Sequence, residues 1–372
     1  MPADISVILP TMNEEKAISI VLPKLKESLE KMGLSYEIIV VDKSVDNTPD
    51  IASSFGAIVV HQKNRGYGDA YITGFNYARG KYIVMGDPDG SYDFSELPKL
   101  LEPLLRDEAD LVICTRLRGK IEKGAMPWLH RYIGNPLLTK ILNFLFKTKI
   151  SDAHCGFRAI RRDALEKLPL KCRGMEFASE MIIEAAKAGL RIKEVPITYH
   201  PRIGKSKLNS FRDGWRHLRL MLLYSPSYLF ILSGISFVIG GAGLMAYAYN
   251  TNPLRVHSLI LASLLIIVGF QIINFGIFSR VYAVKEGLEK PDRITKFFMK
   301  YSILEEGLLL SAVLLAIGLG IGIDIFLKWQ ASGYGELFEI KQAILVMTLI
   351  ALGIQLAFFS FFVSILMLKE GS

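Results

Sequence analysis

Four long apolar stretches in the second half of the chain constrain its fold more than any other feature. Each is long enough, at about 1.5 Å per residue of helix, to cross a hydrocarbon core roughly 30 Å thick. They carry few charges and would have no polar face to show to water, which disfavours buried helices of a large soluble core. Asp324, late in the third stretch, is expected near an interface. The sequence predicts four membrane-spanning helices, at residues 228–249, 257–278, 303–327 and 343–368.

The first part of the chain has the pattern of an α/β domain. Short apolar runs alternate with segments of helical spacing, such as residues 14–31 and 68–78. This pattern predicts a mainly parallel, Rossmann-like sheet, in which ligands bind beyond the carboxyl ends of the strands. We expect this domain at residues 1–225 and an α-helical transmembrane domain at residues 226–372. The expected strands are residues 5–9, 36–41, 57–60, 82–86 and 111–114.

The net charge of +8 restricts the partners of the chain. A basic balance suits nucleic acid, an anionic membrane surface or phosphorylated substrates. The sequence has no zinc-finger spacing, homeodomain pattern or RNP motif, and its apolar half favours the latter two. We therefore expect no nucleic-acid partner. The widely spaced Cys114, Cys155 and Cys172, with a start that lacks a signal-peptide pattern, predict reduced thiols in a cytosol-facing domain.

The loops between the apolar stretches predict the orientation in the membrane. Residues 280–300 carry six Lys or Arg side chains, whereas residues 251–256 and 329–342 carry one each. Basic loops stay in the cytoplasm, and an even number of spans places the first domain on the same side. Residues 128–147 and 211–224 mix basic with aromatic and aliphatic side chains. They predict helices on the bilayer surface, or alternatively soluble helices with a basic face.

The strongest chemical motif is YIVMGDPDGSYD, at residues 82–93. A buried strand delivers Asp87 and Asp89 to the carboxyl edge of the sheet, where two carboxylates can hold Mg²⁺ or Mn²⁺. Such a metal would neutralise a diphosphate leaving group. The spacing alone is weak evidence, because a polar turn that caps the next helix has the same pattern. Asp93 is a third ligand, a supporting residue or a cap near Ser95.

Six segments, in order, resemble the motifs of family-2 glycosyltransferases with a GT-A fold, and the resemblance covers roughly residues 4–225. Within this family the chain is similar to dolichol-phosphate mannose synthases and polyprenyl-phosphate glucosyltransferases. The resemblance implies a GT-A catalytic domain followed by the four-span transmembrane domain. The segments are ISVILPTMNEE, VVDKSVDNT, NRGYGDAYITGF, GDPDGSYDFSELPKL, CGFRAIRRDAL and GMEFASEMIIEAAKAGLRIKEVP.

The resemblance also assigns residues to the nucleotide-sugar. It places Asp42 where the family reads the base, although the frequent second Asp is replaced by Lys43, which could instead approach a phosphate. Glycines at the start of a helix let backbone N–H groups approach an anion, and Gly66 and Gly68 are expected to do so. The expected donor-binding residues are Pro10, Thr11, Asn13, Glu14, Asp42, Gly66, Gly68, Asp87, Arg202 and Lys207.

Asp89, Arg116 and Arg131 form the expected catalytic group. The resemblance places both arginines near the phosphate of the acceptor lipid, and a guanidinium suits phosphate oxygens. Glu176 and Glu180, four residues apart, would touch the sugar or acceptor, or else form helical ion pairs.

The implied reaction moves one sugar from GDP-mannose, UDP-glucose or UDP-N-acetylglucosamine onto dolichyl or polyprenyl phosphate, with inversion. A lipid phosphate is already anionic near neutral pH and needs no general base, so His154 and His200 are not needed as bases. The donor and the oligomeric state stay open, a homo-oligomer being one option. A processive polysaccharide synthase is disfavoured by the absence of a Q-x-x-R-W motif. A non-catalytic scaffold is disfavoured by the intact Asp87/Asp89 pair.

Overall fold

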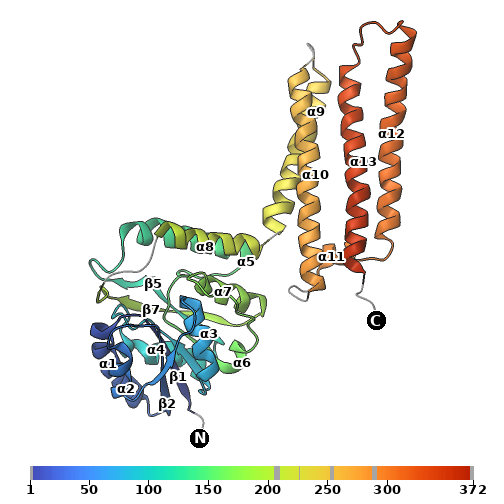
Figure 1. Cartoon of the computed structure of the whole chain (residues 1–372). Helices are drawn as coiled ribbons and strands as arrows, with labels where there is room; N and C mark the ends of the chain where they lie inside the picture. Colours follow the sequence, from blue (N-terminus) through green and yellow to red (C-terminus); the bar gives the residue numbers. More distant parts are fainter. Residues whose placement is uncertain (1–2, 205–209, 226, 252–254, 287–290, 369–372) are drawn as a thin grey trace. The chain divides into compact units, whose positions relative to one another are not determined.

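The computed structural model divides into two compact units, Met1–Tyr224 and Ser225–Ser372 (Figure 1). It describes residues 3–204, 210–225, 227–251, 255–286 and 291–368. The first unit holds the sheet and the second consists of helices.

A seven-stranded sheet forms the centre of the first unit, in the order β3-β2-β1-β4-β6-β5-β7. All pairings are parallel except those of β6, which runs antiparallel to β4 and β5. The five predicted strands are confirmed, with ends shifted by one or two residues, except that β5 extends seven residues beyond its predicted end. They are β1 (Ile5–Thr11), β2 (Tyr36–Asp42), β3 (Ile58–His61), β4 (Tyr82–Met85) and β5 (Leu111–Ile121).

Two strands were not predicted, β6 (Arg158–Arg161) and β7 (Ile192–Tyr199). β6 has only two apolar residues between charged ends, so it lacks the apolar run of a central strand. β7 contains Pro196 and lies at the sheet edge, where a residue without an N–H is tolerated.

Helices cover the sheet because each has one apolar stripe. In α1 (Glu15–Met32) the fully buried side chains recur at helical spacing, as at Ile18, Leu22 and Leu29. The helix α3 (Tyr67–Tyr77) contacts β1 and β2. The remaining helices around the sheet are α2 (Thr48–Ser54), η1 (Phe94–Glu96), α4 (Leu97–Leu105), α6 (Arg162–Leu165) and α7 (Phe177–Lys187).

The segments expected at the membrane surface are helical. A π-helical turn, η2 (His130–Gly134), leads into α5 (Asn135–Phe146), and α8 (Ser210–Leu223) contacts α5 and α7. Large apolar side chains of this region are exposed, although an exposed Trp or Phe is uncommon on a surface that meets only water. They include Trp128, Tyr132, Leu137, Phe144, Phe211, Trp215 and Leu223.

Four helices of the second unit, among the described residues, are long and apolar enough to cross a membrane, as predicted. Contacts join α9 to α10, α12 to α13, and α10 to α13, where Ser263 and Thr348 share a hydrogen bond of 2.7 Å. Most of the four extend beyond the predicted apolar stretch, because a helix does not end where its apolar residues do. The long helices are α9 (Ser233–Tyr249), which continues the short helix η3 (Ser227–Leu232), α10 (Val256–Lys285), α12 (Ile303–Ala331) and α13 (Ile340–Met367). A short helix, α11 (Arg293–Phe298), lies between α10 and α12 in the sequence.

Candidate active site

A cavity of about 1220 Å³ lies within the first unit, beyond the carboxyl ends of β1 and β4. This is the edge at which parallel sheets bind ligands. Asn13, Asp42, Gly68 and Arg131, also predicted as site residues, are not part of its wall. Lys207 lies outside the described residues. The predicted site residues that line the cavity are Pro10, Thr11, Glu14, Gly66, Asp87, Asp89, Arg116 and Arg202.

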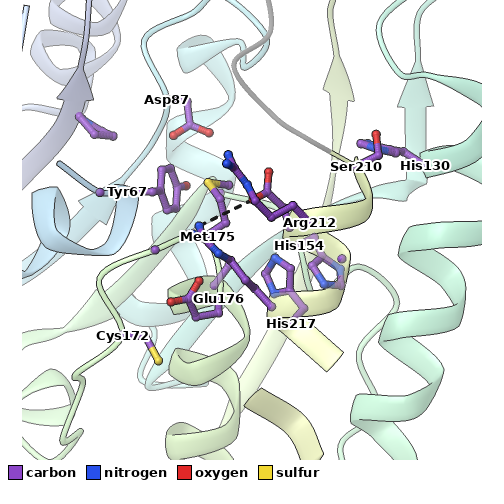
Figure 2. Close-up of a pocket in the computed structure, with 18 of the residues that line it drawn as sticks. Tyr67, Asp87, His130, His154, Cys172, Met175, Glu176, Ser210, Arg212 and His217 are labelled. Carbon is purple, nitrogen blue, oxygen red and sulfur yellow. Dashed lines mark hydrogen bonds and ion pairs between the residues drawn. The ribbon is translucent and has the colours of Figure 1, made fainter. Parts of the chain in front are cut away.

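Asp87 lies two residues beyond the end of β4, and Figure 2 shows the ring of Tyr67 near its carboxylate. The Tyr71 hydroxyl donates a hydrogen bond of 3.4 Å to Asp87 Oδ1, and Tyr67 lies beside the same carboxylate. Burial, and then the charge of Asp89, raise the pKa of Asp87 to about 7. The negative charges of these two carboxylates repel each other, and a cation bound to both would relieve the repulsion.

Asp89 is oriented by Ser91 and paired with Arg202. Its Oδ1 accepts hydrogen bonds from the Ser91 backbone N–H at 2.9 Å and from the Ser91 hydroxyl. Its Oδ2 lies 3.3 Å from Nη2 of Arg202, which is also 3.7 Å from Oε1 of Glu14. Asp93 instead accepts from the Ser95 N–H at 3.0 Å and caps η1. Of the roles considered for Asp93, the structure supports the cap.

Asp87 and Asp89 fit a metal ion that is held partly by the protein and partly by the phosphates of its substrate. No cluster of three or more His, Cys, Asp or Glu side chains that could hold a metal occurs in the described parts of the chain. Mg²⁺ is commonly held by one or two carboxylates together with substrate phosphates, so a pair is enough. Asp87 and Asp89 would be these ligands.

The carboxylate of Asp42 is buried and hydrogen-bonded to neighbouring residues. Only 2% of this residue is exposed. Its carboxylate accepts hydrogen bonds from the Thr11 hydroxyl at 2.7 Å and from the N–H and hydroxyl of Ser44. The Lys43 ammonium donates to the carbonyl oxygens of Gln62 and Lys63, at 3.0 and 2.9 Å. These contacts fix the Asp42 carboxylate at the end of β2, and Lys43 holds the chain after β3. The base-reading role of Asp42 stays a prediction.

The two glycines at the start of α3 lie against a segment that is distant in the sequence, and their anion-binding role stays a prediction. The N–H groups of Gly68 and Asp69 donate to the carbonyl oxygens of Gly174 and Arg173, at 3.2 and 3.1 Å. A Cβ at Gly66 would collide with the Arg173 carbonyl, and one at Gly68 with that of Cys172. These glycines therefore allow residues 172–174 to approach α3, and these N–H groups are not available to an anion.

The two predicted acceptor arginines have different environments. Arg116 lines the cavity, and its Nε and Nη2 donate to the buried carboxylate of Asp152 at 2.7 and 2.8 Å. Although burial alone would raise the pKa of Asp152, the Arg116 guanidinium holds it below its ordinary value. Arg131 does not line the cavity, and its guanidinium lies over the ring of Tyr132, 5.3 Å from the centroid.

Glu176 and Glu180 are also separated by the fold. Glu176 lines the cavity. Glu180 is fully buried, and its carboxylate accepts from the N–H groups of Lys171 and Cys172 and from the Tyr224 hydroxyl. Of the two, only Glu176 can meet a ligand, whereas Glu180 anchors the chain before α7.

Part of the cavity wall is apolar and comes from the chain around α5 and from α8. Arginines of α8 line the same cavity, namely Arg212, Arg216 and Arg219. The sequence pattern indicated an amphipathic basic helix here but did not place it at the site. The apolar wall residues from these segments are Leu129, Ile133, Leu138, Phe211, Leu220 and Leu223.

Two family models match the chain. Residues 6–169 match "Glycosyl transferase family 2", and residues 277–367 match "Glycosyltransferase family 2 C-terminal transmembrane region". The second match covers the end of α10 together with α12 and α13, and with the four apolar helices it makes the chain a membrane protein.

Relatives and solved structures agree with these matches. The low-salt glycan biosynthesis hexosyltransferase Agl6 of Haloferax volcanii is 42% identical over 363 residues, which span 96% of this chain and 87% of that protein. A dolichyl-phosphate hexose transferase of the same organism is 35% identical over 57% of this chain and 89% of its own length. The glucosyl-3-phosphoglycerate synthase of Mycobacterium tuberculosis, 23% identical, superposes with a TM-score of 0.50 over 60% of this chain and 80% of its own.

The last likeness shows the fold alone, and it agrees with the predicted GT-A architecture of the sheet domain. The family rests on the match over nearly the whole length of a curated relative and on both family models. The chain is therefore a membrane-bound glycosyltransferase that belongs to glycosyltransferase family 2.

Proposed function

We propose that this enzyme transfers a single sugar from a nucleotide-sugar to a polyprenyl phosphate, with inversion at the anomeric carbon. The observation that carries the proposal is the composition of one cavity wall. It contains the carboxylates of Asp87 and Asp89 and also the apolar side chains of the α5 and α8 region. A charged donor and an acceptor with a hydrocarbon tail require these two kinds of surface in one cavity.

The relatives support the same substrate classes. One is named a hexosyltransferase of glycan biosynthesis and another a dolichyl-phosphate hexose transferase. The M. tuberculosis synthase was crystallised with Mn²⁺ and UDP. For this chain we propose Mg²⁺ or Mn²⁺ on the evidence of its own carboxylates, which occur as a buried, mutually repelling pair.

Asp87 and Asp89 would hold the divalent cation, which supplies charge neutralisation for a diphosphate leaving group. Ser91 and Tyr71 fix the directions in which these carboxylates point. Arg202, within ion-pair distance of Asp89, is placed to contact the same diphosphate. Arg116, oriented by its ion pair with Asp152, adds a buried guanidinium to the wall. The acceptor phosphate attacks unaided, because it is ionised, and a single in-line displacement inverts the sugar.

The first unit carries this chemistry in our proposal, and the second, from Ser225, anchors it in the membrane. The basic residues between α10 and α12 favour a cytoplasmic position for that loop and for the first unit. Lys296 and Ser332 flank α12. In a Cys172→Ser background, an impermeant maleimide should label Ser332→Cys on intact cells and Lys296→Cys only after permeabilisation. The reverse pattern would refute this orientation.

The reaction is tested with the full chain in membranes. Labelled GDP-mannose, UDP-glucose and UDP-N-acetylglucosamine are supplied in parallel with dolichyl or undecaprenyl phosphate and Mg²⁺ or Mn²⁺. We expect one donor to give a lipid-extractable product whose mass equals the lipid phosphate plus one sugar, and EDTA to abolish it. A product with many sugars would favour a polysaccharide synthase, and binding without turnover would favour a scaffold.

A further inference from the structure

Some buried polar atoms in the cavity wall have no hydrogen-bond partner among the described residues. They are both ring nitrogens of His154, Oε2 of Glu176 and Nε of Arg202. Leaving a buried polar group without a partner is unfavourable, so such groups in a cavity wall point to contacts with a ligand. Arg202 is already assigned to the diphosphate. His154 has the most unsatisfied atoms and no role in the proposed chemistry so far.

His154 is held in place by an unusual support. The buried guanidinium of Arg158, 1% exposed, donates to the carbonyl oxygens on both sides of His154. These bonds run from Nη2 to Ala153 at 2.9 Å and from Nε to Cys155 at 2.8 Å. A third, from Nη1 to Ala178 at 2.7 Å, ties this loop to α7. No carboxylate among the described residues lies within ion-pair distance of Arg158, so its charge stabilises the backbone around His154.

The supported loop lies between the carboxylate pair and α8. Two residues after His154, a Cβ at Gly156 would lie 2.8 Å from Oδ2 of Asp87. On the other side, the ring of His154 meets the ring of His217 edge to face, with centroids 4.5 Å apart (Figure 2). His217 lies on α8 and shares a hydrogen bond of 2.8 Å with the Ser179 hydroxyl. His154 therefore lies between the loop residue that approaches Asp87 and the helix that supplies part of the apolar wall.

The chemistry around His154 suits an anion. Arg116 and the α8 arginines line the same cavity. Burial, and then His217, lower the pKa of His154 well below its ordinary value, so the imidazole is neutral and offers one N–H donor. Both ring nitrogens of His154 are buried, so contact with an acceptor requires a neighbouring side chain, such as the His217 ring in edge-to-face contact, to move.

We propose that His154 donates a hydrogen bond to the phosphate of the lipid acceptor, and that Arg158 is the residue that positions it. This inference rests on the proposed function, because it takes the acceptor to be a polyprenyl phosphate. A hydroxyl of the transferred sugar is the other group that an imidazole N–H could meet, and the experiment separates the two.

The test measures the affinity of the purified full chain in detergent for farnesyl phosphate, a short polyprenyl phosphate, and the KM values for lipid phosphate and donor. His154→Phe keeps the ring and removes the donor, His154→Gln keeps a donor, and His200→Phe is the control. His200 pairs with Glu122 at 3.0 Å and does not line the cavity. We expect about a 10-fold or greater loss of farnesyl phosphate affinity in His154→Phe. His154→Gln should recover most of it, and His200→Phe should match the wild type.

Arg158 is tested by a double variant. Arg158→Lys should weaken farnesyl phosphate binding in the wild-type background and have little further effect in His154→Phe, because both changes act through one contact. If Arg158 had only a structural role, Arg158→Lys would weaken farnesyl phosphate binding equally in both backgrounds. Should His154→Phe fail to fold, judged by thermal melting, His154→Leu takes its place.

The outcomes separate this inference from the proposed function. If the wild type binds farnesyl phosphate through His154 but makes no lipid-linked sugar, the proposed function fails and the inference stands. Unchanged farnesyl phosphate affinity in His154→Phe overturns the inference, as does a rise confined to the donor KM, which would assign His154 to the sugar. A wild type that does not bind farnesyl phosphate overturns it as well.

Discussion

Nη2 of Arg202 lies 3.3 Å from Oδ2 of Asp89, a proposed metal ligand. The same guanidinium reaches Glu14, while its Nε has no partner among the described residues. The Arg202 guanidinium therefore lies beside the carboxylates that would hold the metal, and its Nε–H is still available to donate a hydrogen bond. This is the arrangement expected of a residue that contacts the diphosphate when the donor is bound.

Removing this guanidinium should lower the rate of sugar transfer. We expect Arg202→Ala to reduce kcat/KM by about 100-fold, the usual cost of losing one group that stabilises developing charge. Arg202→Lys should recover part of the loss, because it keeps the charge but not the fork of donors. Arg106→Ala, which removes a surface partner of Glu102, is the matched control. Equal activity of Arg202→Ala and the control would refute the assignment.

The Tyr71 hydroxyl should act on the metal through Asp87. Tyr71→Phe removes the hydrogen bond to Oδ1 of Asp87 and leaves the stacked ring, which lies 5.7 Å from that of Phe177. Loss of such supporting bonds typically costs 10–100-fold in metal affinity, and we expect about 10-fold here. The Mn²⁺ concentration for half-maximal transfer measures it. A lower rate at an unchanged Mn²⁺ requirement would contradict this role.

The start of α3 should not tolerate a side chain. Gly68→Ala places a Cβ against the carbonyl of Cys172 and the ring of Phe177, both tied to the core. We expect a loss of about 1–3 kcal/mol in the free energy of unfolding, as for other overpacked sites. Gly214→Ala in α8, where a Cβ meets nothing within 4 Å, is the control and should not destabilise. Similar melting temperatures for both variants would show that residues 172–174 can move to accommodate the added Cβ.

The first unit should lose stability as the pH falls through the range of histidine. Burial, foremost, lowers the pKa of His217 to about 4, against an ordinary value near 6.5. Below pH 6.5 the unfolded chain binds a proton that the folded chain does not. The stabilisation is therefore complete above that pH and declines towards pH 4, by about 3 kcal/mol in all.

Thermal melting between pH 7 and 4.5 measures this effect. The variant His217→Gln removes the titrating ring and should show a shallower decline than the wild type. His154, whose pKa is lowered too, would keep part of the slope. Identical slopes in the two proteins would place the pH dependence elsewhere.

The sequence alone predicted the features that are encoded locally. The apolar runs gave five strands and four membrane helices, and β4 delivers Asp87 and Asp89 to the sheet edge within a few residues. Pairings between distant segments were not predictable in this way. The match of Asp42 to a base-reading position could not reveal that Thr11 and Ser44 occupy its carboxylate.

The same limit explains why the surroundings of other residues could not be predicted. The glycines of α3 have the pattern of an anion site, yet the chain that fills their space lies about a hundred residues later, at 172–174. The sequence indicated only that His154 is not needed as a base, because its support by Arg158 and its contact with His217 exist only in the fold. No sequence motif marks Asp152, and its role becomes evident only from its ion pair with Arg116 in the fold. The roles of the site residues remain predictions.

The central claim is tested most directly by comparing two neighbouring carboxylates in the transfer assay. Asp89 lines the cavity, whereas Asp93 caps η1 and does not. With the donor that the wild type uses, Asp89→Asn should lose at least about 1,000-fold in lipid-linked product, the upper range for a charge-stabilising group. Asp93→Asn should retain most activity if folded. Equal activity of both variants, or no lipid-linked sugar from any donor with a folded, inserted wild type, would contradict the account.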